Sequence, residues 1–177
     1  SERAALVRRG LWLNAASLAY NVAEAGVALA LGVAAGSPLL VGFGSDSVIE
    51  VTATLAARWR LGVDHDPARR VRVEWWAHRV IGACFLLLAA WVTWESVATL
   101  VRREPPDASP WGVALLTVSA LLMPWVARAK RRLAVALGSG ALVADATQTA
   151  ICAWLSVIAL TGLAAHALFG WWWADPA

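Results

Sequence analysis

The sequence predicts an all-α membrane protein, a polytopic bundle of transmembrane helices. Apolar residues make up 60% of its 177 residues, whereas a soluble domain usually contains ~45–50%. They come in blocks of about 20 or more, the length that crosses the hydrocarbon core of a bilayer as a helix. Both cysteines, Cys84 and Cys152, fall within such blocks, so no disulfide framework is expected. We therefore expect one transmembrane domain over residues 1–177 and no soluble C-terminal domain.

Five spans follow from the apolar blocks. They are predicted at residues 11–34, 39–59, 76–101, 110–127 and 133–169. Polar segments are expected at residues 36–38, 60–79, 103–107 and 128–132, after a basic lead-in at residues 1–9. The last block is long for one membrane helix, so we expect the fifth helix to begin outside the bilayer.

The first span carries a polar stripe. Asn14, Ser17, Asn21 and Glu24 are spaced three, four and three residues apart, which places them on one face of a helix. Polar side chains at membrane depth face the interior of a helix bundle. Hydrogen bonds between helices, made by serine and asparagine, would explain such a stripe. Glu24 at mid-span instead favours a binding site or an ion path.

The second span carries two carboxylates within one helical turn. Asp46 and Glu50 are four residues apart and share a face with Thr54. A central aspartate costs roughly 2.5–3.5 kcal/mol in a membrane helix, and the cost is normally offset by a partner charge, a proton or a metal ion. We expect no lysine or arginine inside any span except near its ends, which makes a buried ion pair the weaker explanation. The two carboxylates are therefore interpreted as half of a cation site.

The third and fourth spans contain few polar groups. Glu95 lies about two turns from Arg102 and Arg103, and we expect it at the membrane interface beside them. The fourth span contains Thr117 and Ser119 as its polar groups, which do not form a stripe. Neither span is therefore expected to provide the second half of a cation site.

The fifth span supplies that second half. Asp145, Gln148, Cys152 and Ser156 are spaced three, four and four residues apart, with Thr149 beside them. Carboxylate, amide and thiol groups all coordinate divalent metals. A helical rise of ~1.5 Å per residue puts the carboxylates of the second and fifth spans at nearly the same depth in a core ~30 Å thick, so the stripes can meet. If the stripe of the first span joins them, three helices converge on one polar centre.

The basic residues predict the orientation. Most of the 15 lysines and arginines lie in three segments: 3 at the N-terminus, 6 at residues 58–79 and 4 at residues 128–132. The positive-inside rule places these three basic segments, including the N-terminus, on the cytoplasmic side of the membrane. We expect this membrane to be a bacterial inner membrane. Five spans would leave the C-terminal end outside. The final run is Trp171-Trp172-Trp173-Ala174-Asp175-Pro176. Its tryptophans are typical of a membrane-interface belt, and its Asp-Pro pair is typical of the start of a helix, so we expect a sixth span to follow.

Two short motifs resemble the cation diffusion facilitators, a family that exports divalent metals in exchange for protons. The Asp-x-x-x-Asp of that family's second helix resembles Ser45-Asp46-Ser47-Val48-Ile49-Glu50, with glutamate for the second aspartate. The His-x-x-x-Asp of its fifth helix, which follows an Ala-Asp pair, is similar to Ala144-Asp145-Ala146-Thr147-Gln148-Thr149-Ala150-Ile151-Cys152. The helix order, the basic loop after the second helix and the Trp-x-Ala-Asp turn are also similar, so the resemblance covers essentially the whole chain.

The resemblance implies a metal site and its substrate. The implied ligands are Asp46, Glu50, Gln148 and Cys152. Further metal or proton-path residues would be Asn21, Glu24, Asp145 and Thr149. Glutamine and cysteine replace the family's histidine and aspartate, so the site lacks imidazole. The divalent metal, which is a substrate, is then zinc, iron, manganese or cobalt.

The resemblance also implies a transporter rather than an enzyme. We expect efflux by proton-coupled antiport with alternating access, in a homodimer that contacts the lipid bilayer, metal ions and protons, and no nucleic acid. Two other functions stay open: a proton-coupled exporter of small organic cations, and a non-transporting membrane assembly or sensor protein. An intramembrane aspartyl protease is disfavoured because Ser45 stands where its Gly-x-Gly-Asp motif needs aspartate.

Overall fold

The computed structural model describes residues 2–35, 38–102 and 110–169. Within these ranges the chain forms five α-helices and no strand. The helices are α1 (Glu2–Ala35), α2 (Pro38–Gly62), α3 (Pro67–Arg102), α4 (Pro110–Leu137) and α5 (Gly140–Phe169). Each is long and apolar enough to cross a membrane. The predicted all-α polytopic bundle of five spans is confirmed.

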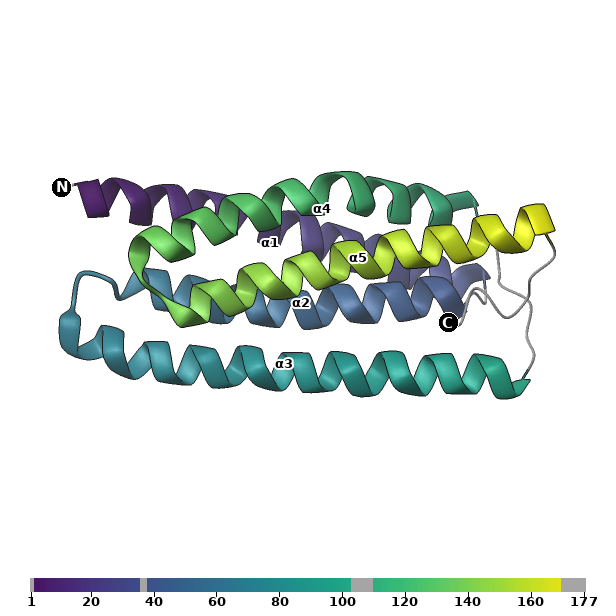
Figure 1. Ribbon diagram of the computed structural model, residues 1–177, viewed down its shortest axis with the longest axis horizontal. Coiled ribbons are helices and arrows are strands. Elements are labelled where there is room, and N and C mark those ends of the chain that lie inside the picture. Colours follow the sequence, from purple (N-terminus) through teal and green to yellow (C-terminus); the bar gives the residue numbers. More distant parts are fainter. Residues whose placement is uncertain (1, 36–37, 103–109, 170–177) are drawn as a thin grey trace.

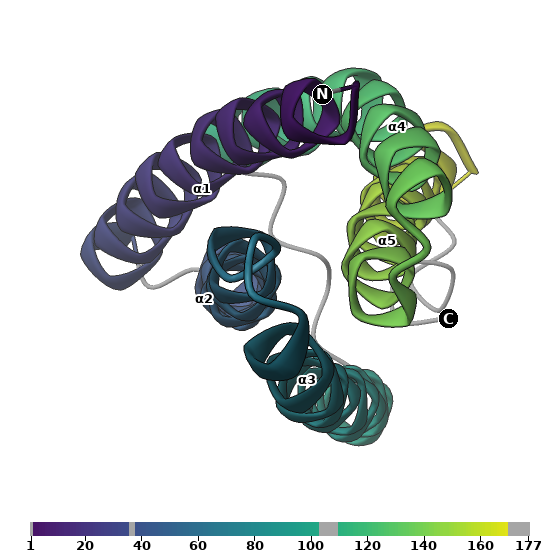
Figure 2. The ribbon, with the colours of Figure 1, turned by 90° about the vertical axis from the view of Figure 1, so that its left-hand side faces the viewer.

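The helices run alternately up and down in one bundle (Figure 1). The N-terminus, the α2–α3 turn and the α4–α5 turn lie at one end, which we call the basic end because most lysines and arginines flank it. α2 packs against α1, α3 and α5, and α4 packs against α1 and α5. Viewed along the bundle, α2 lies on the concave side of an arc formed by α1, α4 and α5, with α3 beside it (Figure 2). The helix with the two predicted carboxylates is thus surrounded by neighbours.

The third helix begins earlier than the hydropathy predicts. The sequence predicts a polar loop over residues 60–79, but only residues 63–66 separate α2 from α3. Pro67 suits the first helical position because its fixed φ fits a helix and its missing N–H needs no partner there. Asp66 caps the helix by accepting hydrogen bonds from the next free amides, at 3.0 and 3.1 Å. The helix therefore starts in the charged segment, before the apolar block.

The fourth helix likewise continues through the predicted basic loop at residues 128–132. Arginine, alanine and lysine, which fill this stretch, are strong helix formers. Gly138 ends the run with a positive φ of 63°, a conformation that glycine adopts without strain. Ser139 then caps α5, since its Oγ accepts a hydrogen bond from the amide three residues on at 3.2 Å. α5 starts at Gly140, later than the apolar block from which it was predicted.

Some predictions fall partly or wholly outside the described residues. They concern the turn after the first span, the loop after the third span, and the tryptophan-rich run with the sixth span expected after it. The lead-in at residues 1–9 was wrongly predicted as separate from the first helix, because α1 already includes residues 2–9.

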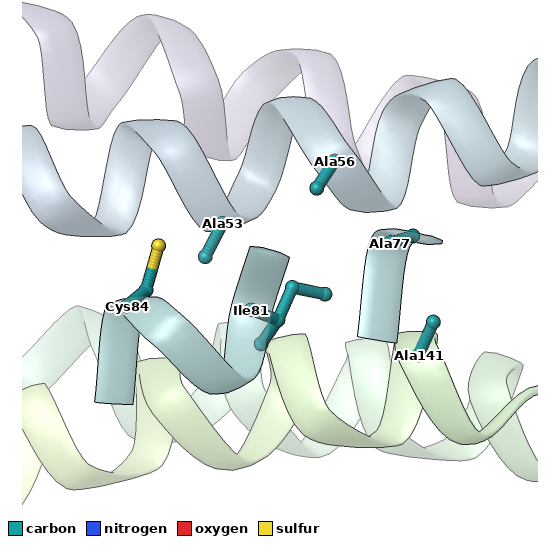
Figure 3. Packing of buried hydrophobic residues seen from close by; sticks show 6 residues of the cluster. All are labelled: Ala53, Ala56, Ala77, Ile81, Cys84 and Ala141. Atoms are coloured by element: carbon teal, nitrogen blue, oxygen red, sulfur yellow. The ribbon is translucent and has the colours of Figure 1, made fainter. Parts of the chain in front are cut away.

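Small residues let the helices approach closely. Six buried residues join α2, α3 and α5 (Figure 3): Ala53, Ala56, Ala77, Ile81, Cys84 and Ala141. A second buried cluster joins α2, α4 and α5: Ala57, Leu61, Ala134, Leu137 and Leu142. Between α1 and α2, a Cβ atom at Gly32 would lie 2.8 Å from the backbone nitrogen of Val41, so this contact requires glycine. Membrane helices associate through such small residues, because van der Waals packing rather than exclusion of water drives their contact.

Large apolar side chains point away from the bundle. Trp12, Leu86, Leu121 and Trp154 are each more than 60% exposed, and they lie on four different helices. A soluble monomer rarely exposes extensive apolar surface. The outward faces of the helices are therefore suited to contact lipid.

A network of charges joins the helix ends at the basic end. Arg60 of α2 binds Asp64 at 3.0 Å and also binds Glu74 of α3. Asp64 accepts two further hydrogen bonds from the guanidinium of Arg3, both at 2.8 Å. Glu74 accepts hydrogen bonds from Ser139 Oγ and from an amide at the start of α5, each at 2.7 Å. The hydrogen bond from Arg3, assisted by that from Arg60, holds the pKa of Asp64 below its usual value against the opposing effect of burial.

Candidate functional site

Polar residues from three helices gather inside the bundle. We call the polar seam the six side chains Asn21 and Glu24 of α1, Asp46 and Glu50 of α2, and Gln148 and Cys152 of α5. The exposed fraction is 0% for Asn21 and Gln148 and 2% for Glu50. Glu50 is central, since its charge acts on Glu24, Asp46 and Cys152. The structure therefore brings together the stripes of the first, second and fifth spans.

Most seam residues contain polar atoms without a hydrogen-bond partner. Among the described residues eight buried side-chain atoms lack a partner, and six of these belong to Asn21, Asp46, Glu50 and Gln148. An unpaired buried polar atom costs about 1–3 kcal/mol, so such atoms are uncommon where they have no function. Each of the four residues contributes an oxygen to this set. Carboxylate and amide oxygens bind divalent cations, so the seam has the chemistry of a cation site.

The seam is not a closed cage of charged ligands. Among the residues that the structure describes, no three His, Cys, Asp or Glu side chains lie close enough together to hold a metal ion. Asp46 is partly buried, and the charges that act on it are those of Glu95 and Glu50. A cation in the seam would therefore depend on the amide oxygens of Asn21 and Gln148 as well as on carboxylates.

Glu24 differs from the other seam residues because its carboxylate is fully hydrogen-bonded. Tyr20 Oη donates to Glu24 Oε1 at 2.9 Å, and Ser47 Oγ donates to Oε2 at 3.0 Å. Ser119 Oγ, from α4, also donates to Oε1. Sequence reasoning missed Ser119, since a single serine in an apolar span gives no periodic signal. Glu24 therefore joins α1, α2 and α4 rather than offering free oxygens.

Asp145 is paired with a lysine inside the bundle. Lys130 Nζ of α4 lies 3.2 Å from Asp145 Oδ2, and it donates to Thr149 Oγ1 at 3.0 Å. The side chains of Lys130 and Asp145 are 4% and 3% exposed. The expectation that no lysine or arginine lies inside a span is wrong, because α4 continues as a helix through the basic segment. Its turn directs Lys130 inward, while Arg131 and Arg132 are exposed.

Six of the eight predicted site residues thus fall into two groups. Asp46, Glu50, Gln148 and Asn21 keep unpaired polar atoms. Asp145 and Thr149 lie beside Lys130, together with Thr54 of α2, whose Oγ1 is 3.4 Å from Lys130 Nζ and 3.4 Å from Asp145 Oδ1. We call Lys130, Asp145, Thr54 and Thr149 the lysine cluster.

The protein is an integral membrane protein with a polar interior. Its helices are apolar and their outer faces are suited to lipid, while carboxylates and amides are buried between them. Residues 15–177 match the family described as the cation efflux transmembrane domain. The chain belongs to the cation efflux family, and the resemblance seen in its two motifs is confirmed.

One curated relative is similar over most of the chain. It is the "uncharacterized transporter sll1263" of Synechocystis sp., 28% identical over 169 residues. The similarity covers 91% of this chain and 54% of that protein. The chain therefore spans about half the length of the relative it matches.

Proposed function

We propose that this chain is the transmembrane part of a transporter that exports a divalent metal cation in exchange for protons. The observation that carries the proposal is the set of unpaired oxygens on Asn21, Asp46, Glu50 and Gln148 inside the bundle. Membership of the cation efflux family and similarity to a protein named as a transporter support it.

The proposed metal ligands are Asp46, Glu50, Gln148 and Cys152. This set is rich in oxygen, contains one thiol and lacks imidazole. Zinc favours histidine and cysteine, whereas manganese and iron accept more oxygen ligands. Mn²⁺, Fe²⁺ and Co²⁺ therefore stand beside Zn²⁺ as substrates.

Transport would proceed by alternating access. The basic end faces the cytoplasm under the positive-inside rule, in a bacterial inner membrane, and the seam binds the cation from that side. The bundle then rocks to open outward, and protons from outside compete with the metal for the carboxylates. Glu50, which is buried at the centre of the seam, is the principal residue for this exchange. The transporter would work as a homodimer.

The first test is isothermal titration of the purified full-length protein with Zn²⁺, Fe²⁺, Mn²⁺ and Co²⁺. Asp46→Ala should abolish saturable binding because it removes a carboxylate ligand. Thr52→Ala is the matched control, since Thr52 lies on the exposed face of the same helix and bonds the carbonyl of Val48 at 3.2 Å. If no ion binds, or if both variants bind like the wild type, the proposed site is wrong.

A further inference from the structure

We infer that the lysine cluster is a second cation site, on the path between the polar seam and the basic end, and that Lys130 occupies it as a tethered cation. A transported cation would displace the ammonium from Asp145 on its way to or from the seam. This inference rests on the proposed function, which it extends by naming a second step and the residue that controls it.

The contacts of the ammonium group are those of a bound cation. Lys130 Nζ lies 3.2 and 3.3 Å from the two carboxylate oxygens of Asp145, 3.0 Å from Thr149 Oγ1 and 3.4 Å from Thr54 Oγ1. The two threonines are 0% exposed and Asp145 is 2% exposed. Carboxylate and hydroxyl oxygens bind metal cations as well as ammonium groups, because both are electron-pair donors. The oxygens around Lys130 would therefore serve a metal ion once the lysine moved away.

The cluster adjoins the seam on two helices. Thr54 lies one turn after Glu50 on α2, and Thr149 is the residue next to Gln148 on α5. Thr54 lies nearer the basic end than Glu50 because α2 ends there, and Asp145 lies nearer that end than Gln148 because α5 begins there. A cation that enters from the basic end and follows the faces of α2 and α5 therefore reaches the lysine cluster before the seam.

An independent observation supports a polar path at this place. A cavity of about 20 Å³ lies beside the cluster, and its polar lining consists of Asn14, Lys130 and Asp145. Asn14 is 3% exposed, and its Oδ1 has no hydrogen-bond partner. A cavity needs roughly 10–15 Å³ to hold a water molecule, so this one has room for one small polar occupant. A residue of α1 with an unpaired acceptor thus lines the same small cavity as the lysine and the aspartate.

Helix packing alone does not require this pair. Desolvation of two buried charges is only partly offset by their attraction, and apolar residues of similar volume often pack as well or better. A positive charge next to the seam also repels a divalent cation there, and this effect is strong in a medium of low dielectric constant. Lys130 is therefore suited to close the path until a cation competes for Asp145.

The test compares binding of Zn²⁺, Fe²⁺, Mn²⁺ and Co²⁺ in five forms of the full chain by isothermal titration: the wild type, Lys130→Met, Asp145→Asn, the double variant of these two, and Arg131→Met. Lys130→Met should bind at least one of these ions about tenfold more tightly than the wild type, because the competing ammonium is gone. The gain should vanish in the double variant, which lacks the carboxylate. Arg131→Met removes the same charge from the exposed side of α4 and should bind as the wild type does.

Asp145→Asn leaves Lys130 buried without its counter-ion, so it should bind about tenfold more weakly than the double variant. This comparison decides the point if Lys130→Met does not fold. Equal affinity in the wild type and a folded Lys130→Met, or in Asp145→Asn and the double variant, would overturn the inference. Failure of the proposed function looks different, since Asp46→Ala would then bind as the wild type does while the gain in Lys130→Met still depended on Asp145.

Discussion

Ser47 Oγ of α2 donates a hydrogen bond to Glu24 Oε2 of α1 at 3.0 Å, at the edge of the polar seam. The same carboxylate accepts hydrogen bonds from Tyr20 on its own helix and from Ser119 on α4. The hydroxyl donors neutralise none of its charge, but they satisfy its oxygens and hold three helices together. Hydrogen bonds within the protein thus offset the free-energy cost of burying Glu24. Asp46 and Glu50 each keep a buried oxygen without a partner, so their cost is not offset in this way.

Removal of the Ser119 hydroxyl should therefore weaken the bundle. We expect Ser119→Ala to lower the free energy of unfolding by about 1 kcal/mol, the scale of a hydrogen bond between membrane helices. The measurement is reversible unfolding in detergent micelles. Thr117→Ala is the matched control on the same helix, because Thr117 is exposed and bonds the carbonyl of Val113 at 2.7 Å. Equal effects of the two substitutions would contradict the role assigned to Ser119.

Glu50 should be essential for transport under the proposed function. Glu50→Gln keeps the size of the side chain but removes its charge, so we expect metal affinity and flux to fall by about tenfold or more. Uptake of Mn²⁺ and Zn²⁺ into proteoliposomes, at equal protein content, measures the change. Thr52→Ala, on the exposed side of the same helix, again serves as the control. Undiminished flux in Glu50→Gln would remove this residue from the site.

Cys152 should influence which metal is preferred. A thiolate is a soft ligand that favours zinc over manganese, whereas a serine hydroxyl does not. We expect Cys152→Ser to lower the affinity for Zn²⁺ more than the affinity for Mn²⁺, as measured by titration of each ion. Cys84→Ser is the control, since Cys84 packs in the apolar cluster of α2, α3 and α5. A parallel loss for both ions would show that Cys152 is not a ligand.

Asp64 should make the basic end sensitive to acid. Its hydrogen bonds to Arg3 and Arg60 lower its pKa in the folded protein. The stabilisation is therefore complete above the unfolded pKa of ~3.9 and is lost as the pH falls through the lower folded value. We expect wild type and Asp64→Asn to differ in unfolding midpoint at about pH 6 to 7, where the carboxylate is charged. The difference should shrink as the pH falls below about 4, the unfolded pKa, and disappear below the folded pKa.

The control for this pH series is Glu2→Gln, which removes an exposed carboxylate at the same end of the bundle. It should change the midpoint little at any pH, because exposed charges contribute little. A difference between wild type and Asp64→Asn that stayed constant down to about pH 3 would contradict the assigned ion pair, because about one unit below the unfolded pKa the carboxylate of the unfolded chain is protonated and the stabilisation should already have decreased.

Much of the fold and part of the site could be predicted from local pattern. The spacing of Asp46 and Glu50, and of Gln148 and Cys152, predicts a shared helix face, and the cost of charge in a membrane predicts that this face turns inward. The ends of α3 and α4 could not be predicted in the same way. Hydropathy marks the ends of the apolar blocks, but the hydrogen-bonded helix continues past them when its residues favour a helix, as it does before Trp76 and after Ala127.

The sequence by itself determined that the chain forms apolar helices, and which of their faces are polar, because both depend on residues within a few turns of one another. Only the tertiary structure decided which polar groups meet. Two contacts depend on how far each helix extends and how it is rotated against its neighbours: that of Lys130 with Asp145 and that of Ser119 with Glu24. Those rotations are set by close contacts between helices, such as that of Gly32 with Val41, which no local pattern encodes.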